Sequence, residues 1–272
     1  MIIGQISDLH IRESGELAYG IVDAAAHLRR CVADVLALKQ KPDLLVLTGD
    51  LVDCGLAGEY AVLRQILAPL TMPCYVIPGN HDERAALRAA FADHAYLNQS
   101  GRFIQYAIDD WPVRIVAVDT VVPGAERGEV CAERLAWLDA RLSGAPEKPT
   151  VVIMHHPPFA TGIGHMDRIG LDGTSALAGV IRRHPQVERL LCGHLHRPIQ
   201  ARFAGTLAST CPSPAHQVAL DLAPDAPSCF MLEPPAYQLH AWRPGTGIVS
   251  HTAYVGSFAG PHPFRADGKL IR

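Results

Sequence analysis

Gly79-Asn80-His81-Asp82 (residues 79–82) is one of five polar stretches in this chain that each follow a short apolar run. The apolar runs have the length and composition of buried β-strands. Side chains placed just beyond the carboxyl ends of strands in an open α/β sheet converge on a single crevice. The sequence therefore predicts an α/β fold in which polar residues distant along the chain meet at one site. The five runs are residues 2–6, 44–47, 75–77, 151–154 and 187–191.

The polar stretches supply seven side chains that can bind a metal ion, all through oxygen or nitrogen. Taken singly, each has an ordinary explanation, because an Asp at a strand end is often a helix cap and Gly-Asn is often a turn. Five such strand ends in a compatible order indicate a metal site instead. The candidate ligands are Asp8, His10, Asp50, Asn80, His155, His194 and His196.

Seven donors are too many for one ion. A structural zinc site takes about four ligands and usually some cysteine, and a catalytic zinc site keeps about three ligands plus water. One bridging carboxylate would let seven ligands hold two ions roughly 3.5–4 Å apart, the spacing of two-metal hydrolytic sites. Imidazole and carboxylate ligands suit Fe, Mn, Zn or Co without choosing among them. The predicted cofactor is a pair of divalent or trivalent first-row metal ions.

These stretches match, in order, the sequence blocks of the calcineurin-like metallophosphoesterases, and the chain resembles that superfamily over about residues 1–200. Within it, the chain looks most like the bacterial glycerophosphodiesterase and class III cyclic-nucleotide phosphodiesterase branch. It departs from the serine/threonine protein phosphatases, which carry an arginine where this chain has Cys54, and this argues against a phosphoprotein monoesterase. The matching motifs are Asp8-x-His10, Gly49-Asp50-x-x-Asp53, Gly79-Asn80-His81-Asp82, His155-His156 and Gly193-His194-x-His196.

The resemblance implies an α/β sandwich of two mixed β-sheets, face to face and flanked by helices, with the metals at the carboxyl edge of the strands. It implies a binuclear phosphodiesterase that hydrolyses small phosphodiesters, glycerophosphodiesters or cyclic nucleotides, by attack of a metal-bound hydroxide. It also implies that Asp50 bridges the ions. The first ion would take Asp8, His10, Asp50 and His196, and the second Asp50, Asn80, His155 and His194.

Three residues are expected to contact the substrate. Asn80 is one of them, and its neutral oxygen should hold the second ion more weakly than a carboxylate would. His81 is next to a ligand without being one, so we expect it to hydrogen-bond the phosphate or to protonate the leaving group. The resemblance implies a substrate contact for His216. Two further residues stay open: Asp119 is expected to be a cap or turn rather than a ligand, and His165 either contacts substrate or is an ordinary loop residue.

The chain is expected to have two parts. Residues 1–204 would form the metallophosphoesterase core, and residues 205–272 a β-rich portion that completes the second sheet and makes cap or oligomer contacts. Aromatic residues are enriched at the buried centres of interfaces, and four of them near the end of the chain predict a homo-oligomer, at least a dimer. The alternative is that this segment packs on its own subunit. The four aromatic residues are Trp242, Tyr254, Phe258 and Phe264.

Five helices are predicted, and the first is amphipathic by its periodic apolar residues, with Asp23 as its N-cap. Residues 103–108 and 113–118 are expected to form a pair of strands. The five helices are expected at residues 23–39, 59–70, 83–96, 132–142 and 174–184.

The amino-acid composition indicates which substrates and which compartment suit this chain. The 272 residues are 49% hydrophobic and carry 24 Lys and Arg against 27 Asp and Glu, a net charge of −3 without a basic stripe. Long nucleic acid is therefore a poor substrate. No apolar stretch approaches the roughly 18 residues of a membrane span, and no leader is evident. Seven scattered cysteines suit a reducing cytoplasm, so we expect a cytoplasmic enzyme acting on a small phosphodiester.

Three other functions stay open from the sequence: a phosphomonoesterase of the same fold, a DNA nuclease, and a metal-binding scaffold without catalysis. A nuclease would be expected to carry a basic face, and a scaffold would be expected to lose ligands such as His10. The residues do not name the physiological substrate or the two metals.

Overall fold

Strand β1 (Ile2–Ile6) lies in the middle of a five-stranded sheet of order β15-β14-β1-β2-β3. The structure is a computed structural model that describes residues 1–98 and 101–271. On one side, β1 runs parallel to β2 (Leu44–Thr48), which is followed by β3 (Cys74–Ile77). On the other side it pairs antiparallel with β14 (Ala236–Arg243), which forms a hairpin with β15 (Gly247–Tyr254).

A six-stranded sheet of order β10-β11-β9-β7-β5-β4 forms the second layer. Strands β5, β7, β9 and β11 are parallel, and β4 and β10 are antiparallel edge strands. This is the mixed pair of sheets that the resemblance implies. The strands are β4 (Tyr106–Ile108), β5 (Arg114–Val118), β7 (Thr150–Met154), β9 (Val187–Cys192), β10 (Gln200–Phe203) and β11 (Thr206–Thr210).

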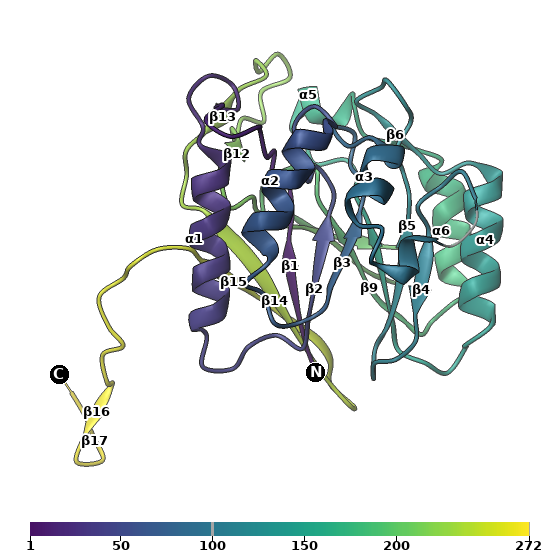
Figure 1. The fold of residues 1–272 in the computed structure, drawn as a ribbon. Coiled ribbons are helices and arrows are strands. Elements are labelled where there is room, and N and C mark those ends of the chain that lie inside the picture. Colours follow the sequence, from purple (N-terminus) through teal and green to yellow (C-terminus); the bar gives the residue numbers. More distant parts are fainter. Residues whose placement is uncertain (99–100, 272) are drawn as a thin grey trace.

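Helices cover the outer faces of the two sheets (Figure 1). Helices α1, α2 and α3 flank the five-stranded sheet, and α4 and α6 flank the six-stranded one. The Asp23 side chain accepts a hydrogen bond from Ala26 N, as expected of the N-cap of α1. The helices are α1 (Ala24–Ala37), α2 (Ala57–Leu67), α3 (Arg84–Ala90), α4 (Ala132–Ser143), α5 (Gly164–Asp167) and α6 (Thr174–Arg182), with a 3-10 turn at Ala95–Asn98.

The prediction of a helix over residues 83–96 is wrong in length, because the observed helix α3 is shorter and ends at Ala90. The chain turns after Phe91, and the hydroxyl of Tyr96 then reaches the edge strand β3. That hydroxyl donates to Cys74 O and accepts from Val76 N, both at 3.0 Å. A continuous helix would leave these edge groups of β3 without the Tyr96 hydroxyl, so a tertiary hydrogen bond overrides the helical pattern.

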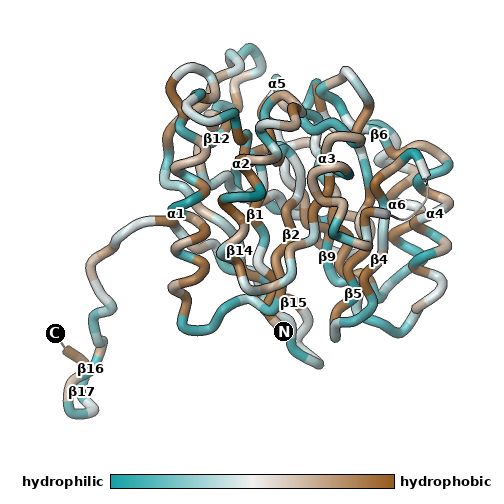
Figure 2. Tube along the Cα trace, in the orientation of Figure 1, coloured by the Kyte–Doolittle hydropathy of each residue, from teal (hydrophilic) through white to brown (hydrophobic). Residues whose placement is uncertain are grey.

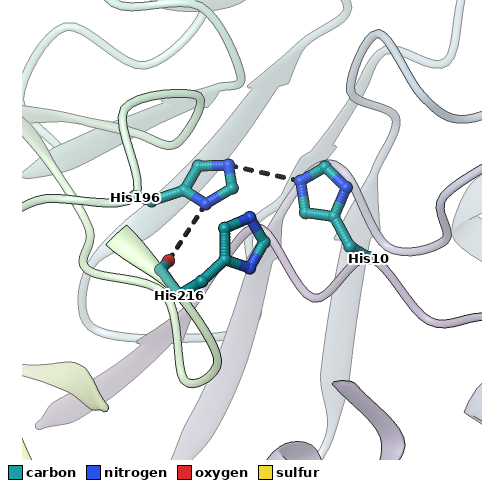
Figure 3. Close-up of side chains that lie close together, drawn as sticks. All are labelled: His10, His196 and His216. Carbon is teal, nitrogen blue, oxygen red and sulfur yellow. Dashed lines mark hydrogen bonds between the residues drawn. The ribbon is translucent and has the colours of Figure 1, made fainter. Parts of the chain in front are cut away.

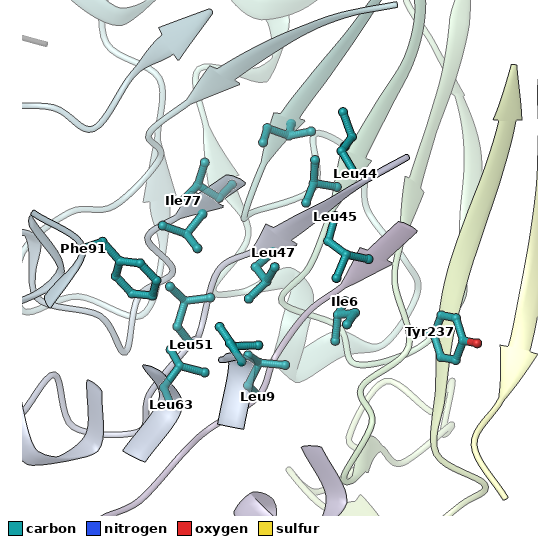
Figure 4. Close-up of a cluster of buried hydrophobic side chains, with 14 of the residues drawn as sticks. Ile6, Leu9, Leu44, Leu45, Leu47, Leu51, Leu63, Ile77, Phe91 and Tyr237 are labelled. Atoms are coloured by element: carbon teal, nitrogen blue, oxygen red, sulfur yellow. The ribbon is translucent and has the colours of Figure 1, made fainter. Parts of the chain in front are cut away.

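Apolar side chains pack both between the sheets and under the helices, because successive strand residues face opposite ways. In β5, Ile115 packs between the two sheets, whereas Val116 packs under α4 and α6. Figure 4 shows part of the larger hydrophobic cluster, which also includes Leu63 of α2, a helix on the outer face of the five-stranded sheet. In Figure 2, hydrophobic segments concentrate in the strands and hydrophilic ones in the outer loops.

A buried polar group joins the two sheets. Gln5 of β1 donates from Nε2 to Thr48 Oγ1 and to Cys192 O, both at 2.9 Å, and Cys192 belongs to the other sheet. Its Oε1 accepts from Nε2 of His240 in β14 at 3.0 Å. His240 Nδ1 in turn meets the hydroxyl of Ser250 at 2.6 Å. Because each buried group has a partner, this network fixes the register of the sheets without a large desolvation penalty.

The last part of the chain contributes to both sheets. Within residues 205–272, β11 belongs to the six-stranded sheet, and β14 and β15 belong to the five-stranded one. Beyond Val255, residues 256–271 are exposed and extend away from the body to a small hairpin of β16 (Arg265–Ala266) and β17 (Lys269–Leu270) (Figure 1). We call residues 256–271 the C-terminal arm. Within the described ranges, no helix is both long and apolar enough to cross a bilayer.

Candidate metal centre

Four of the candidate ligands form one compact set. Nε2 of His10 lies 3.2 Å from Nε2 of His196 and 3.6 Å from Oδ2 of Asp50. Nε2 of His196 lies 3.8 Å from Oδ1 of Asp8. One donor atom from each of these four residues lies within 4.8 Å of all the others, which is close enough for a single ion to contact them all.

The other three candidates gather around Asn80. Its Oδ1 lies 3.1 Å from Nε2 of His155 and 3.1 Å from Nδ1 of His194. Oδ2 of Asp50, which also belongs to the first set, lies 3.3 Å from Nε2 of His155. The seven side chains thus form two adjacent sets that share Asp50. This is the same grouping that the resemblance implies.

Each histidine of the two sets is oriented by a hydrogen bond at its other ring nitrogen. His10 Nδ1 bonds Asp53 at 3.0 Å, and His155 Nδ1 bonds Thr48 O at 2.8 Å. His194 Nε2 bonds Ile169 O, and His196 Nδ1 bonds the carbonyl of His216, both at 3.1 Å. A neutral imidazole that donates at one nitrogen accepts at the other, so each ring directs its free lone pair into the centre. Metal-binding histidines are held in this way.

The charges of the centre favour a bound cation. Burial, together with the negative charge of the nearby Asp50, raises the pKa of Asp8 to about 6. Oδ2 of Asp8 is buried and has no hydrogen-bond partner among the described residues. Burial and the charge of His155 lower the pKa of His194 to about 3, so His194 is neutral, the form that binds metals. Against the effect of burial, Asp50 and Asp8 raise the pKa of His155 to about 9. A buried, unpartnered carboxylate oxygen in a centre that attracts positive charge fits the predicted pair of metal ions.

The backbone is strained where it presents these ligands. Asp8, His10, Asp50, His194 and His196 all have positive φ, from 47° to 72°. Such residues are uncommon outside glycine, cost about 1–3 kcal/mol each, and cluster at functional sites. The chain turns sharply at the strand ends, so that alternate side chains point back into one space.

Gly79 is not needed for a left-handed backbone conformation, because its φ is not positive. It is needed for another reason. A Cβ at Gly79 would lie 2.2 Å from both the backbone N and Oδ1 of Asp50, so only glycine lets the third polar stretch approach the shared carboxylate. Asp82 then closes the turn by accepting from Gly79 N at 2.8 Å and from Leu51 N at 3.0 Å.

A cavity of about 420 Å³ opens above the two sets. His81 lines it, with Nδ1 held by the carbonyl of Asp53 at 2.7 Å, which leaves Nε2 for a substrate. His216 also lines it. Figure 3 shows His216 close to His10 and His196, and its ring centroid lies 5.3 Å and 4.5 Å from theirs. His165 is on the cavity wall as well, within reach of a substrate.

Asp119 lies outside the centre. Its carboxylate is bound by Arg84 Nε at 2.6 Å and Nη2 at 2.8 Å and also accepts from Ile104 N. It therefore anchors the start of α3, which agrees with the structural role expected of it. His156 has both ring nitrogens occupied, by Thr120 Oγ1 at 2.8 Å and by Glu126 O at 3.0 Å, so it supports the loop that carries Glu126.

Several residues in and around the site were given no role from the sequence. Asp53, which orients His10, could have been found from its position three residues after Asp50, because metal-bound histidines commonly donate to a carboxylate. Glu126, Phe230 and Ile169 gave no such signal, because they lie in loops whose positions depend on tertiary contacts.

Known proteins are similar to this chain in sequence or in fold. The profile of the calcineurin-like phosphoesterase family matches residues 1–198. A probable glycerophosphodiester phosphodiesterase of Arcobacter nitrofigilis is 40% identical over 273 residues, covering 100% of both chains. A probable cyclic nucleotide phosphodiesterase of Synechococcus is 35% identical over 249 residues, covering 89% of each. Among solved structures, a dimetal phosphatase from Danio rerio superposes with a TM-score of 0.63 at 17% identity, covering 94% of this chain and 99% of the other.

Proposed function

The chain belongs to the calcineurin-like phosphoesterase family, and on that basis we propose that it hydrolyses glycerophosphodiesters at the centre formed by the two ligand sets. It is a phosphoric diester hydrolase of the metal-dependent type. The observation that carries the proposal is the pair of donor sets sharing Asp50 at the floor of the cavity.

The proposed ligand roles follow the two sets. Asp8, His10 and His196 would hold one ion, Asn80, His155 and His194 the other, and Asp50 would contact both. When bound, such ions supply positive charge for the phosphoryl oxygens and lower the pKa of a water towards neutrality. We propose first-row metal ions from the group Fe, Mn, Zn and Co, because these ligands suit all four.

His81 is proposed as the group that meets the departing alcohol. Its backbone N donates to Oδ1 of Asp50 at 3.0 Å, and its Nδ1 is held by Asp53 O, so the ring is fixed beside the shared carboxylate. A proton held on Nε2 can pass to the alkoxide oxygen as the P–O bond breaks. Asn80 and His216, which line the same cavity, are proposed to contact the phosphate and its substituents.

A diester suits the cavity better than a monoester does. Among its described lining residues there is no Lys or Arg that could balance the second negative charge of a monoester. The identity over both full lengths supports a glycerophosphodiester, because the Arcobacter protein carries that name. A cyclic nucleotide is the second candidate, favoured by the aromatic rings of Tyr19 and Phe230, whose centroids lie 5.1 Å apart on the cavity wall.

A homo-oligomer is also proposed, built by the C-terminal arm. Phe264 is 85% exposed and Phe258 67% exposed, and an isolated two-stranded hairpin such as β16–β17 is marginally stable in water. Docking on a second copy would cover both rings. We propose a cytoplasmic enzyme, which suits seven cysteines that are all free thiols. The division at residue 204 stays a proposal; it falls in the turn between β10 and β11.

The test of the proposed function is a turnover panel. Purified protein would be assayed on a glycerophosphodiester, a 3′,5′-cyclic nucleotide and glycerol phosphate, with Mn, Fe, Co or Zn supplied separately. We expect the highest kcat/KM on the glycerophosphodiester. Faster hydrolysis of glycerol phosphate than of either diester would contradict the proposal, and a preference for the cyclic nucleotide would select the second candidate.

A further inference from the structure

Arg12 lies two positions after the ligand His10, in the loop that follows β1, and is not among the described residues that line the cavity. Its side chain is 23% exposed. Nη1 donates to Oδ2 of Asp53 at 3.3 Å and lies 3.4 Å from Oε1 of Glu59, and Nη2 donates to Oε2 of Glu16 at 2.6 Å. One cation therefore meets three carboxylates, which come from two separate segments of the chain.

Asp53 connects this cation to two residues of the centre. Nδ1 of His10 bonds Oδ1 of Asp53 at 3.0 Å, and Nδ1 of His81 bonds its backbone carbonyl at 2.7 Å. The other carboxylate oxygen of Asp53 is the one that Arg12 binds. A carboxylate that is bound at both oxygens keeps one orientation, and the orientation of such a group affects the affinity of the histidine beside it for a metal.

Glu59 requires a cation at this position. Its side chain is completely buried, and Arg12 is the only cation within ion-pair distance of it among the described residues. Its Oε2 accepts from Cys54 N at 2.9 Å and from Leu56 N at 3.1 Å, so Glu59 holds the backbone that follows Asp53. A buried carboxylate without a counter-ion is unfavourable, and the ion pair therefore secures the conformation of this segment.

The shape of the guanidinium matters as well as its charge. A guanidinium is a planar fork with five N–H donors, whereas the ammonium of lysine is a compact point charge on a flexible stem. Arg12 uses two of its nitrogens to reach Asp53, Glu59 and Glu16 together. Arg12→Lys keeps the charge but loses the fork, so it separates the geometry of the contacts from their electrostatic field.

We propose that Arg12 is a positioning residue of the metal centre, which fixes Asp53 and thereby the rings of His10 and His81. Because Arg12 does not line the cavity, it acts through Asp53 and not on the substrate. The link to His10 concerns metal binding alone. The link to His81 rests on the proposed function, in which that ring meets the departing alcohol.

The first test compares metal affinities at constant net charge. Chelator competition with Zn²⁺ would give the dissociation constants of the two bound ions in the natural sequence and in Arg12→Lys. We expect one constant to rise about 3–10-fold and the other to stay, a smaller effect than the 10–100-fold scale for loss of a direct partner of a metal-binding histidine. In an Asp53→Asn background, Arg12→Lys should change neither constant further.

Arg102→Lys is the matched control. Arg102 is 68% exposed, pairs with Glu133 and is not a described cavity residue, so both constants should stay unchanged. Unchanged constants in Arg12→Lys, an equal rise in both, or the same rise in the Asp53→Asn background would each refute the proposal. If Arg12→Lys does not fold, its combination with Glu59→Gln removes the unpaired buried charge and is measured in the same way.

The second test follows the link to His81. Arg12→Lys should lower kcat with little change in KM, and by a larger factor for an alkyl diester than for bis(4-nitrophenyl) phosphate, whose leaving group hardly needs a proton. A general loss of structure would lower both rates alike, so equal losses would refute this link. If the natural protein hydrolyses no diester, the proposed function fails, and the metal affinities still decide the link to His10.

Discussion

The Nε2 atoms of His10 and His196 lie 3.2 Å apart, although 186 positions separate the two residues in the chain. Each ring is held at Nδ1, His10 by Asp53 and His196 by the carbonyl of His216. Two such nitrogens face one another favourably only when a cation lies between them, as a proton or as a metal ion. The fold brings them together from opposite sheets, so metal binding and stability of the sandwich are linked.

Metal removal should therefore lower thermal stability. A ligand that binds only the folded state at about 100 times its Kd adds roughly 2.7 kcal/mol, which raises Tm by several degrees in a chain of this size. Protein treated with chelator and then supplied with Mn or Zn would be compared by calorimetry. Equal Tm values with and without metal would contradict a centre that joins the two sheets.

Asn80→Ala should weaken the second metal selectively. Its Oδ1 lies between His155 and His194 and is the only neutral oxygen among the seven donors. We expect about a 10–100-fold loss of affinity for one ion, with the other retained, because supporting groups of metal sites have effects on that scale. Elemental analysis after dialysis against graded metal concentrations measures this. One tightly bound ion at full activity in the natural protein would contradict a two-metal enzyme.

His81→Ala should keep both metals yet lose turnover. The ring is next to the ligand sets, but its Nδ1 is already held by Asp53 O. A general acid contributes about 10²–10⁴-fold, and the loss should shrink for diesters with a nitrophenolate leaving group, which hardly needs a proton. Kinetics on alkyl and nitrophenyl diesters separate the two roles. An equal loss on both would assign His81 to phosphate binding instead.

His240 should make the fold sensitive to acid. Burial lowers the pKa of His240 to about 3 in the folded chain, against 6.5 for an ordinary histidine. Because the folded pKa is depressed, the unfolded chain binds the extra proton between these values, and stability is lost as pH falls below about 6.5. Denaturant unfolding would measure how far the free energy of unfolding falls between pH 7 and pH 5. This fall should be roughly 2 kcal/mol smaller in His240→Gln than in the natural sequence. The same loss in both would exclude His240 as a source of the sensitivity.

Removal of the C-terminal arm should change the oligomeric state. A stop after Val255 keeps β14 and β15, so both sheets remain complete, whereas a stop after Leu222 would remove two strands of the first sheet. We expect the shortened chain to have a smaller mass by light scattering and an unchanged circular dichroism spectrum. The substitutions Phe264→Ser and Phe258→Ser in the full chain should also lower the mass measured by light scattering. A shortened chain of unchanged oligomeric mass would show that the arm builds no interface.

The strands that present the ligands could be predicted because each combines an apolar run with a polar motif at its end. The arrangement of the seven candidates into two sets came from the family resemblance, since ligand type alone does not pair residues. The positive φ of residues such as Asp8 and His194 leaves no local signature, because those residue types occur in many turns. The end of α3 depends on a hydrogen bond from Tyr96 to a distant strand, which helical periodicity cannot register.

The wall of the cavity was the hardest part to predict. Glu126 lies in a short loop, and its distance from the centre is set by His156, which is itself part of a recognised motif but is fully occupied by structural contacts. Gln5 was hidden for a similar reason, because a single amide within residues 2–6 does not disturb an apolar strand pattern. The pattern of apolar and polar residues along the sequence therefore does not predict buried polar contacts between distant segments.

The pairing of β1 with β14 has a consequence for synthesis on the ribosome. Residue 2 leaves the exit tunnel more than 230 residues before its partner, and at about 5–20 residues per second this leaves the β1 edge open for roughly 10–50 seconds. An open, apolar strand edge is a template for pairing with other chains. Slowing elongation beyond residue 204 should therefore increase the insoluble fraction of newly made chains.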